Sequence, residues 1–289
     1  MRTEQEMLDL ILGIARSEER VRAVYLNGSR ANPHVAKDPW RDYDAVFVVT
    51  ETRPYVEDPA WPARFGEIAI VQEPDRMDAD RGEPMDFDRS YTWLMLFRDG
   101  NRIDLHMETV SVMQEHYGDD SLTVPLLDKD GILPALPPSD DVGYYVTRPA
   151  ERIYQNSANE FWWCLNNVGK GLVRGQIPYV MRMFREIVCL QLERMTAWYI
   201  AAQYDFRVNT GMFGKYFEKY LSADQYARYL ATYPKAEPEA IWEAVFTACE
   251  LFSELARETG RMLGYPYLES EEAGSVEYLR RMHENMPKK

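Results

Sequence analysis

The chain has 289 residues, enough for two modest domains at the usual size of about 100–200 residues each. Its 47 acidic and 33 basic side chains give a formal net charge of -14, which repels phosphate backbones and disfavours nucleic acid as a partner. The same charge attracts a cationic small molecule, although a surplus of acid also simply keeps a protein in solution.

Cysteine usage and the N-terminal sequence indicate the compartment. Cys164, Cys189 and Cys249 lie far apart in apolar helical patterns without CxxC spacing, so we expect buried thiols in a reducing environment. The N-terminal stretch carries acidic residues through its apolar positions, and no apolar run reaches the ~18 residues typical of a membrane span. We therefore expect a cytoplasmic protein that does not associate with membranes. Its expected partners are small molecules, and of the oligomeric states, which the sequence does not determine, we favour a monomer.

The first half of the sequence mixes helical and strand patterns. Thr3 and Glu6 form a capping-box pattern ahead of an amphipathic helix. Gly28-Ser29 is predicted as a turn, and a helix is expected near 109–117. Strands are predicted over residues 21–26, 44–49 and 66–72, and in a hairpin over 91–107 that turns at Asp99-Gly100-Asn101.

The second half reads as helical. A proline-rich segment, Leu133 to Asp141, breaks the periodicity, and we place the domain boundary there, giving domains of 1–138 and 139–289. Pro149, Pro178 and Pro238 are expected in the first turns of helices, where a missing N–H costs little. Helices are predicted over 149–174, 178–203, 213–220, 223–232 and 238–263. The expected fold is α+β, an N-terminal α/β domain with a mixed sheet followed by a C-terminal helical bundle.

Acidic residues interrupt the strand patterns at two places. Asp42 and Asp44 are two residues apart and so project from one face of a strand, where paired carboxylates repel unless a cation such as Mg²⁺ lies between them. The alternative is a strand end near solvent that tolerates two acids. Asp104 lies mid-strand in the predicted hairpin, where a lone carboxylate needs a partner unless that face is solvated.

Gly-Ser at 28–29, Asp-x-Asp at 42–44 and a later strand Asp at 104 form a combined pattern. It resembles the nucleotidyltransferase superfamily that includes DNA polymerase β. More narrowly, the chain resembles the aminoglycoside (streptomycin) 6-adenylyltransferases from "RTEQEMLDLIL" to about Tyr267. The segments that carry this likeness are "GSR", "RDYD", "FGE", "LMLFRDGNRIDL", "LLDKD", "NEFWW" and "GKGLVR".

The resemblance implies an activity. Mg-ATP would be the donor, a hydroxyl of an aminoglycoside, streptomycin first, would be the acceptor, and an AMP ester and pyrophosphate would be the products. Antibiotic resistance is the associated property of the family.

The resemblance also implies residue roles in the first domain. Asp42 and Asp44 would hold Mg²⁺, and Gly28 and Ser29 would seat the triphosphate, with Arg30 adding positive charge. Asp104 would either complete the metal coordination or act as the general base for the acceptor hydroxyl. We prefer the base.

One face of the predicted helix 149–174 is polar. Its residues repeat at spacings of three and four, and this face is either solvated or lines a cleft; we favour a cleft closed over the active site. Glu160, Trp163, Asn167 and Tyr144 are then the acceptor-binding candidates, and Lys170 would meet triphosphate. The polar stripe comprises Asn156, Glu160, Trp163, Asn167, Lys170 and Arg174.

The segment "TGMFGKYF" departs from the family pattern. Met212 stands where the relatives carry a lysine. If that lysine contacts the triphosphate in the relatives, ATP binding here is either weaker or carried by Lys170 and Lys215 alone. Two alternatives to the streptomycin activity follow. The chain is a nucleotidyltransferase with another small-molecule or protein acceptor, or it is a catalytically retired homologue that only binds.

Overall fold

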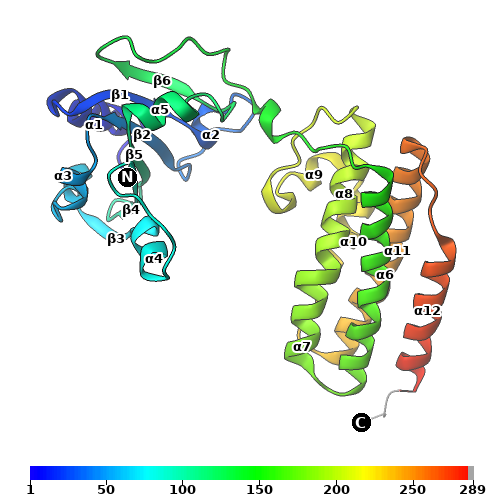
Figure 1. The fold of residues 1–289 in the computed structure, drawn as a ribbon. Coiled ribbons are helices and arrows are strands. Elements are labelled where there is room, and N and C mark those ends of the chain that lie inside the picture. The colour runs from blue at the N-terminus through cyan, green and yellow to red at the C-terminus, as the bar shows by residue number, and fades with distance from the viewer. Residues whose placement is uncertain (286–289) are drawn as a thin grey trace. The chain divides into compact units, whose positions relative to one another are not determined.

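The computed structural model describes residues 1–285, which divide into two compact units (Figure 1). The first unit is Met1–Gly143, and the second begins at Tyr144. The division falls just after the prolines of the segment in which the sequence analysis placed its boundary. Each unit has its own apolar core, so each is described separately.

The first unit is built on a six-stranded sheet. Its strand order is β3-β4-β5-β2-β1-β6, in which β2 and β5 are parallel and the other neighbours are antiparallel. The predicted mixed sheet is therefore confirmed. The strands are β1 (Val21–Leu26), β2 (Tyr43–Val49), β3 (Ile68–Gln72), β4 (Ser90–Phe97), β5 (Arg102–Thr109) and β6 (Val124–Asp128).

Helices cover both faces of this sheet. Helix α1 (Glu4–Ser17) begins with the predicted Thr3–Glu6 capping box and packs Met7 and Ile11 into the larger core. Helix α5 (Val110–His116) packs Met113 against Val46 on the other face. The shorter elements are α2 (Gly28–Ala31), α3 (Arg53–Val56), a 3-10 turn Pro62–Phe65 and α4 (Pro74–Asp80).

The second unit is a helical bundle. Helices α6, α8, α11 and α12 run side by side around a core in which Phe161 and Phe252 stack at 3.8 Å between ring centroids (Figure 1). Cys164, Cys189 and Cys249 are buried thiols, as predicted. The helices are α6 (Glu151–Val173), α7 (Ile177–Arg182), α8 (Cys189–Gln203), α9 (Phe217–Tyr220), α10 (Ala223–Ala231), α11 (Pro238–Leu263) and α12 (Glu269–Glu284).

Several predicted elements need correction. Gly28-Ser29 is the start of the short helix α2 and not a free turn. The predicted helix 213–220 is wrong over its first half, because Gly211, Phe213 and Gly214 all have positive φ and leave only a 3-10 turn before α9. Pro149 precedes α6 instead of lying in its first turn, since the helix begins at Glu151.

The helical run over 177–203 contains one irregularity. Residues Met183–Val188 form a π-helical segment between α7 and α8, an extra-residue insertion that apolar periodicity does not reveal. Within residues 1–285, every helix is too short or too polar to cross a bilayer.

Candidate active site

Two of the predicted carboxylates lie on neighbouring parallel strands. Asp44 of β2 and Asp104 of β5 are directly paired in the strand register. Because side chains alternate along a strand, both project from the sheet face that carries Val46 and Val48, against which α5 packs. Asp44 and Asp104 stand near the first residues of their strands, whereas α5 follows the last residue of β5. The acids are therefore at the end of this face away from that connection.

Asp42, Asp44 and Asp104 interact electrostatically with one another. Burial, and then the charges of Asp104 and Asp42, raise the pKa of Asp44 to about 6. Burial also raises the pKa of Asp42, with Arg102 acting in the opposite direction. The side chains of Asp42 and Asp104 are 35% and 20% exposed, so the cluster remains open to solvent on one side. Three carboxylates this close together repel one another, so the cluster favours the binding of a cation.

A guanidinium already lies among these carboxylates. Arg102 Nε and Nη2 donate to the two oxygens of Asp104 at 2.8 and 2.7 Å. Its Nη1 lies 3.3 Å from Asp42 Oδ2, so one side chain bridges two of the acids. Arg102 was not among the predicted site residues, although its position two residues before Asp104 in a strand puts both side chains on one face.

Gly28 touches the same site from the end of β1. Its φ is +68°, and a Cβ built there would lie 2.1 Å from Asp44 Oδ2. The backbone N–H of Asn27 donates to the Asp44 carbonyl at 2.9 Å, which fixes this segment against β2. Glycine is thus required twice at position 28, by the backbone conformation and by the close approach of a carboxylate.

Arg30 has a different environment from the one expected of a phosphate ligand. Its side chain is only 6% exposed, and its guanidinium lies 3.5 Å from the centroid of the Tyr43 ring. It donates from Nε to the Asp42 carbonyl at 3.0 Å and from Nη2 to the Arg41 carbonyl at 2.7 Å. Arg30 therefore braces the loop that delivers Asp42. Ser29 lies between Gly28 and Arg30 in α2 and is partly exposed.

A further acid adds to the negative potential at Asp44. Asp120 contributes to the raised pKa of Asp44, and its carbonyl accepts a hydrogen bond from Thr123 Oγ1 at 2.8 Å. The same Thr123 hydroxyl donates to Asn27 Oδ1 at 2.9 Å, next to Gly28. Asp120 lies in a loop without strand periodicity, so the sequence alone offered no signal for it.

The polar stripe of α6 is also present in the second unit. Phe161, Cys164, Leu165 and Val168 are buried, whereas the stripe side is open and Trp163 is 67% exposed. Asn156 and Glu160 are exposed near the first half of the helix, and Glu160 accepts a hydrogen bond from the Cys164 thiol at 3.4 Å. The predicted face is thus free to bind a ligand or to be solvated.

The basic end of the stripe borders a hollow. Lys170 Nζ lies 3.5 Å from Asn167 Oδ1, and both line a depression of about 690 Å³ at the junction of α6 and α7. The lining residues are Asn167, Lys170, Arg174, Gln176, Pro178 and Tyr179. Lys170 and Arg174 make this the cationic end of the helix face.

The remaining predicted residues are at the surface of the second unit. Lys215 is exposed, with Nζ 5.1 Å from the centroid of the Tyr216 ring. Met212 is 68% exposed in the 3-10 turn, an unusual exposure for a large apolar side chain. Tyr144 is 48% exposed at the start of the unit.

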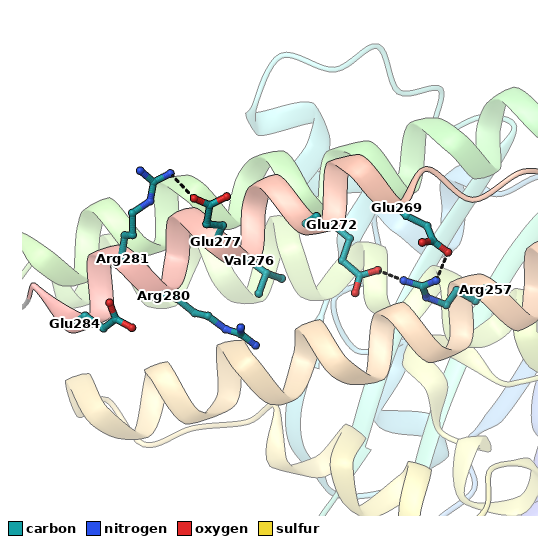
Figure 2. A pocket seen from close by; sticks show the side chains of 9 residues that line it. Arg257, Glu269, Glu272, Val276, Glu277, Arg280, Arg281 and Glu284 are labelled. Atoms are coloured by element: carbon teal, nitrogen blue, oxygen red, sulfur yellow. Dashed lines mark hydrogen bonds and ion pairs between the residues drawn. The ribbon is translucent and has the colours of Figure 1, made fainter.

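Two other charged features lie outside this set of residues. A hollow of about 530 Å³ lies along α12 and α11. Figure 2 shows that Arg257 pairs there with Glu269 and Glu272. Arg281 also pairs with Glu277 at 3.2 Å, so several of the charged groups that line the hollow pair with each other.

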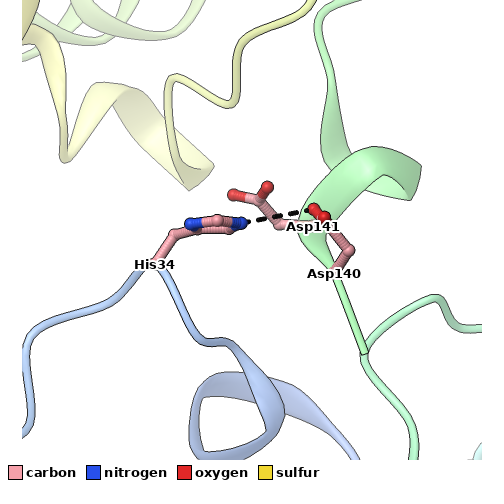
Figure 3. Close-up of side chains that lie close together, drawn as sticks. All are labelled: His34, Asp140 and Asp141. Carbon is pink, nitrogen blue, oxygen red and sulfur yellow. Dashed lines mark ion pairs between the residues drawn. The ribbon is translucent and has the colours of Figure 1, made fainter. Parts of the chain in front are cut away.

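A second group of possible metal ligands lies close to the boundary of the first unit. Figure 3 shows His34, Asp140 and Asp141, whose ligand atoms lie within 4.8 Å of one another. His34 Nε2 is 3.4 Å from Asp140 Oδ1, so the group also ties the loop after α2 to the 3-10 turn Asp141–Tyr144.

The whole chain is similar to one family of enzymes. A family model described as streptomycin adenylyltransferase matches residues 1–282. An aminoglycoside 6-adenylyltransferase of Staphylococcus aureus is 30% identical over 286 residues, covering 99% of this chain and 100% of the relative. One from Bacillus subtilis (strain 168) is 32% identical over 273 residues, covering 94% and 95%. A crystal structure of an aminoglycoside 6-adenyltransferase from Bacillus subtilis is 28% identical, covers 98% of this chain and 99% of its own, and has a TM-score of 0.48.

These matches extend over nearly the full length of the chain and include relatives with at least 30% identity. The protein is a nucleotidyltransferase. It belongs to the streptomycin adenylyltransferase family, and the predicted resemblance to the aminoglycoside 6-adenylyltransferases is confirmed.

Proposed function

We propose that this enzyme transfers AMP from Mg-ATP to a hydroxyl of an aminoglycoside, with streptomycin as the first candidate acceptor, and releases pyrophosphate. The observation that carries the proposal is the pairing of Asp44 with Asp104 across β2 and β5, with Asp42 and Gly28 beside them. The family match and the names of the relatives support the same activity.

The three acids have the donor chemistry that suits Mg²⁺. Carboxylate oxygens are the ligands this ion prefers. Burial, and after it the charge of the neighbouring carboxylates, raises the pKa values of Asp42 and Asp44, and a cation would relieve this repulsion. Asp42 and Asp44 are the proposed ligands, with Asp104 as the third candidate. When bound, the ion neutralises charge on the phosphates and on the transition state.

The transfer itself is a substitution at the α-phosphorus. The acceptor oxygen forms a bond to phosphorus, the bond from that phosphorus to the oxygen bridging the β-phosphate breaks, and pyrophosphate leaves with the electron pair. The hydroxyl proton goes to a carboxylate, for which Asp104 is our candidate. Both oxygens of Asp104 accept hydrogen bonds from Arg102, and each oxygen keeps a further lone pair that can take this proton.

Gly28 and Ser29 are proposed to seat the triphosphate. The absence of a Cβ at Gly28 lets the backbone approach the carboxylates closely, and the partly exposed Ser29 follows directly. We assign Arg30 to bracing the Asp42 loop and not to phosphate contact, because its guanidinium is buried and bonded to carbonyls.

For the second unit we propose that the α6 stripe binds substrate. Glu160 would accept from a guanidinium or ammonium group, a contact suited to an acceptor such as streptomycin, with Trp163, Asn167 and Tyr144 beside it. Lys170 and Lys215 would add positive charge for the nucleotide. The boundary at 138/139, the bundle closing over the active site, a monomeric state and a location in the cytoplasm remain parts of this proposal.

The test is pyrophosphate release from Mg-ATP by purified protein with streptomycin, spectinomycin, kanamycin or no acceptor. Release that depends on streptomycin is expected, and Asp44→Asn should abolish it while the protein still unfolds cooperatively. Release of pyrophosphate with another acceptor, and not with streptomycin, would identify that compound as the acceptor substrate. No release with any acceptor, although ATP binds, would favour an acceptor of another class, and loss of ATP binding as well would indicate a retired homologue.

A further inference from the structure

The guanidinium of Arg102 occupies the space between the acids that the proposed function assigns to a metal site. It forms a bidentate pair of hydrogen bonds with Asp104, at 2.8 and 2.7 Å, and a third contact with Asp42 at 3.3 Å. The same contacts raise the pKa of the Arg102 guanidinium, chiefly through the hydrogen bond to Asp104. One positive side chain thus offsets the repulsion between the two carboxylates that it contacts.

Arg102 differs from Arg30 and Arg41 in its exposure and in the groups that it contacts. Its side chain is 42% exposed, whereas the side chains of Arg30 and Arg41 are each 6% exposed. Arg30 and Arg41 donate to backbone carbonyls, which hold them in place. The contacts of Arg102 are with the site carboxylates themselves, so any cation that binds these oxygens competes directly with it.

We propose that Arg102 is a built-in counter-cation. It positions Asp42 and Asp104 while the site holds no metal, and it releases them when the metal–nucleotide complex binds. The inference rests on the proposed function, because it takes these acids as the metal site. Arg102 is therefore a positioning residue that acts through the two acids.

The arrangement has a consequence for the order of binding. A free divalent ion must displace the guanidinium using its contacts with the carboxylates alone. The metal–ATP complex gains further contacts through its phosphates and displaces Arg102 more easily. The enzyme should accordingly bind a free divalent ion weakly and take up its metal together with the nucleotide.

The experiment measures Mn²⁺ binding to the full chain without nucleotide, by the electron paramagnetic resonance signal of free Mn²⁺. Arg102→Gln should tighten Mn²⁺ binding roughly tenfold, because a partly exposed charge-assisted pair no longer competes. The Mn²⁺ affinity of Arg102→Lys should lie between those of the unchanged protein and Arg102→Gln, since an ammonium cannot make the bidentate contact. Arg98→Gln is the matched control, because Arg98 lies in the same hairpin, pairs with Glu67 at 3.5 Å, and should leave the affinity unchanged.

The outcomes separate this inference from the proposed function. Asp44→Asn should weaken Mn²⁺ binding if the acids form the metal site; equal binding by Asp44→Asn and the unchanged protein would overturn both proposals. If Asp44→Asn weakens binding but Arg102→Gln and Arg102→Lys bind no more tightly than the unchanged protein, the counter-cation role alone is wrong. Thermal unfolding in EDTA checks that each variant is folded. If Arg102→Gln does not fold, the Mn²⁺ affinity of Arg102→Lys is compared with that of the unchanged protein instead.

Discussion

Substitution of Gly28 by alanine tests how closely the backbone approaches the acidic cluster. The added Cβ would lie 2.1 Å from Asp44 Oδ2, and contacts of this kind are essentially never shorter than 3.0 Å, so the carboxylate must retreat by about 0.9 Å. The backbone at +68° adds a cost of about 1–2 kcal/mol for any residue with a Cβ. A displacement of about 1 Å in a catalytic group costs on the order of a hundredfold in turnover.

Gly131→Ala separates the two effects. Gly131 lies in the same unit with φ of +66°, and among residues 1–285 no atom beyond its chain neighbours would lie within 4 Å of the new Cβ. Both variants should lose similar stability in thermal unfolding, but only Gly28→Ala should lose pyrophosphate release. If Gly28→Ala turns over as fast as Gly131→Ala, Asp44 is not held where the proposed chemistry needs it.

Three further predictions concern charge. The raised pKa of Asp44 means that, between its usual 3.8 and about 6, the folded chain keeps a proton that the unfolded chain has lost. Stability in EDTA should therefore fall as pH rises through this window, and Asp44→Asn should flatten the fall in chemical unfolding experiments; an unchanged slope would place the titration elsewhere. Glu160→Gln should raise the acceptor KM several-fold and leave the ATP KM unchanged, with Glu151→Gln on the same helix as control. Met212→Lys should lower the ATP KM a few-fold at little cost in stability, because Met212 is 68% exposed. An unchanged ATP KM would mean that this turn does not contact the triphosphate.

Local patterns predicted those elements whose cause is local. The Thr3–Glu6 capping box, the hairpin around Asp99-Gly100-Asn101 and the start of α11 at Pro238 all follow from signals within a few residues. The Asp42–Asp44 pair could likewise be read from strand alternation. In contrast, β6 and α12 were not predicted, because neither has a clear apolar period: most residues of α12 are polar.

The assembly of the site depends on contacts between distant segments. The parallel pairing of Asp44 with Asp104 joins strands separated by the whole β3–β4 region, and no pattern within either strand specifies it. The direction of the Arg30 side chain likewise depends on packing over Tyr43. Arg102 was accessible to sequence reasoning, since the two-residue period that paired Asp42 with Asp44 also pairs Arg102 with Asp104.

We propose that the Asp44–Asp104 cluster carries the transfer of AMP to an aminoglycoside. The most direct measurement follows ATP labelled at either the α- or the γ-phosphate during incubation with Mg²⁺ and streptomycin. We expect the α-label to appear on streptomycin and the γ-label to appear in pyrophosphate, and we expect Asp44→Asn to form neither labelled product. Transfer of the γ-label to streptomycin, or undiminished α-label transfer by Asp44→Asn, would contradict this proposal.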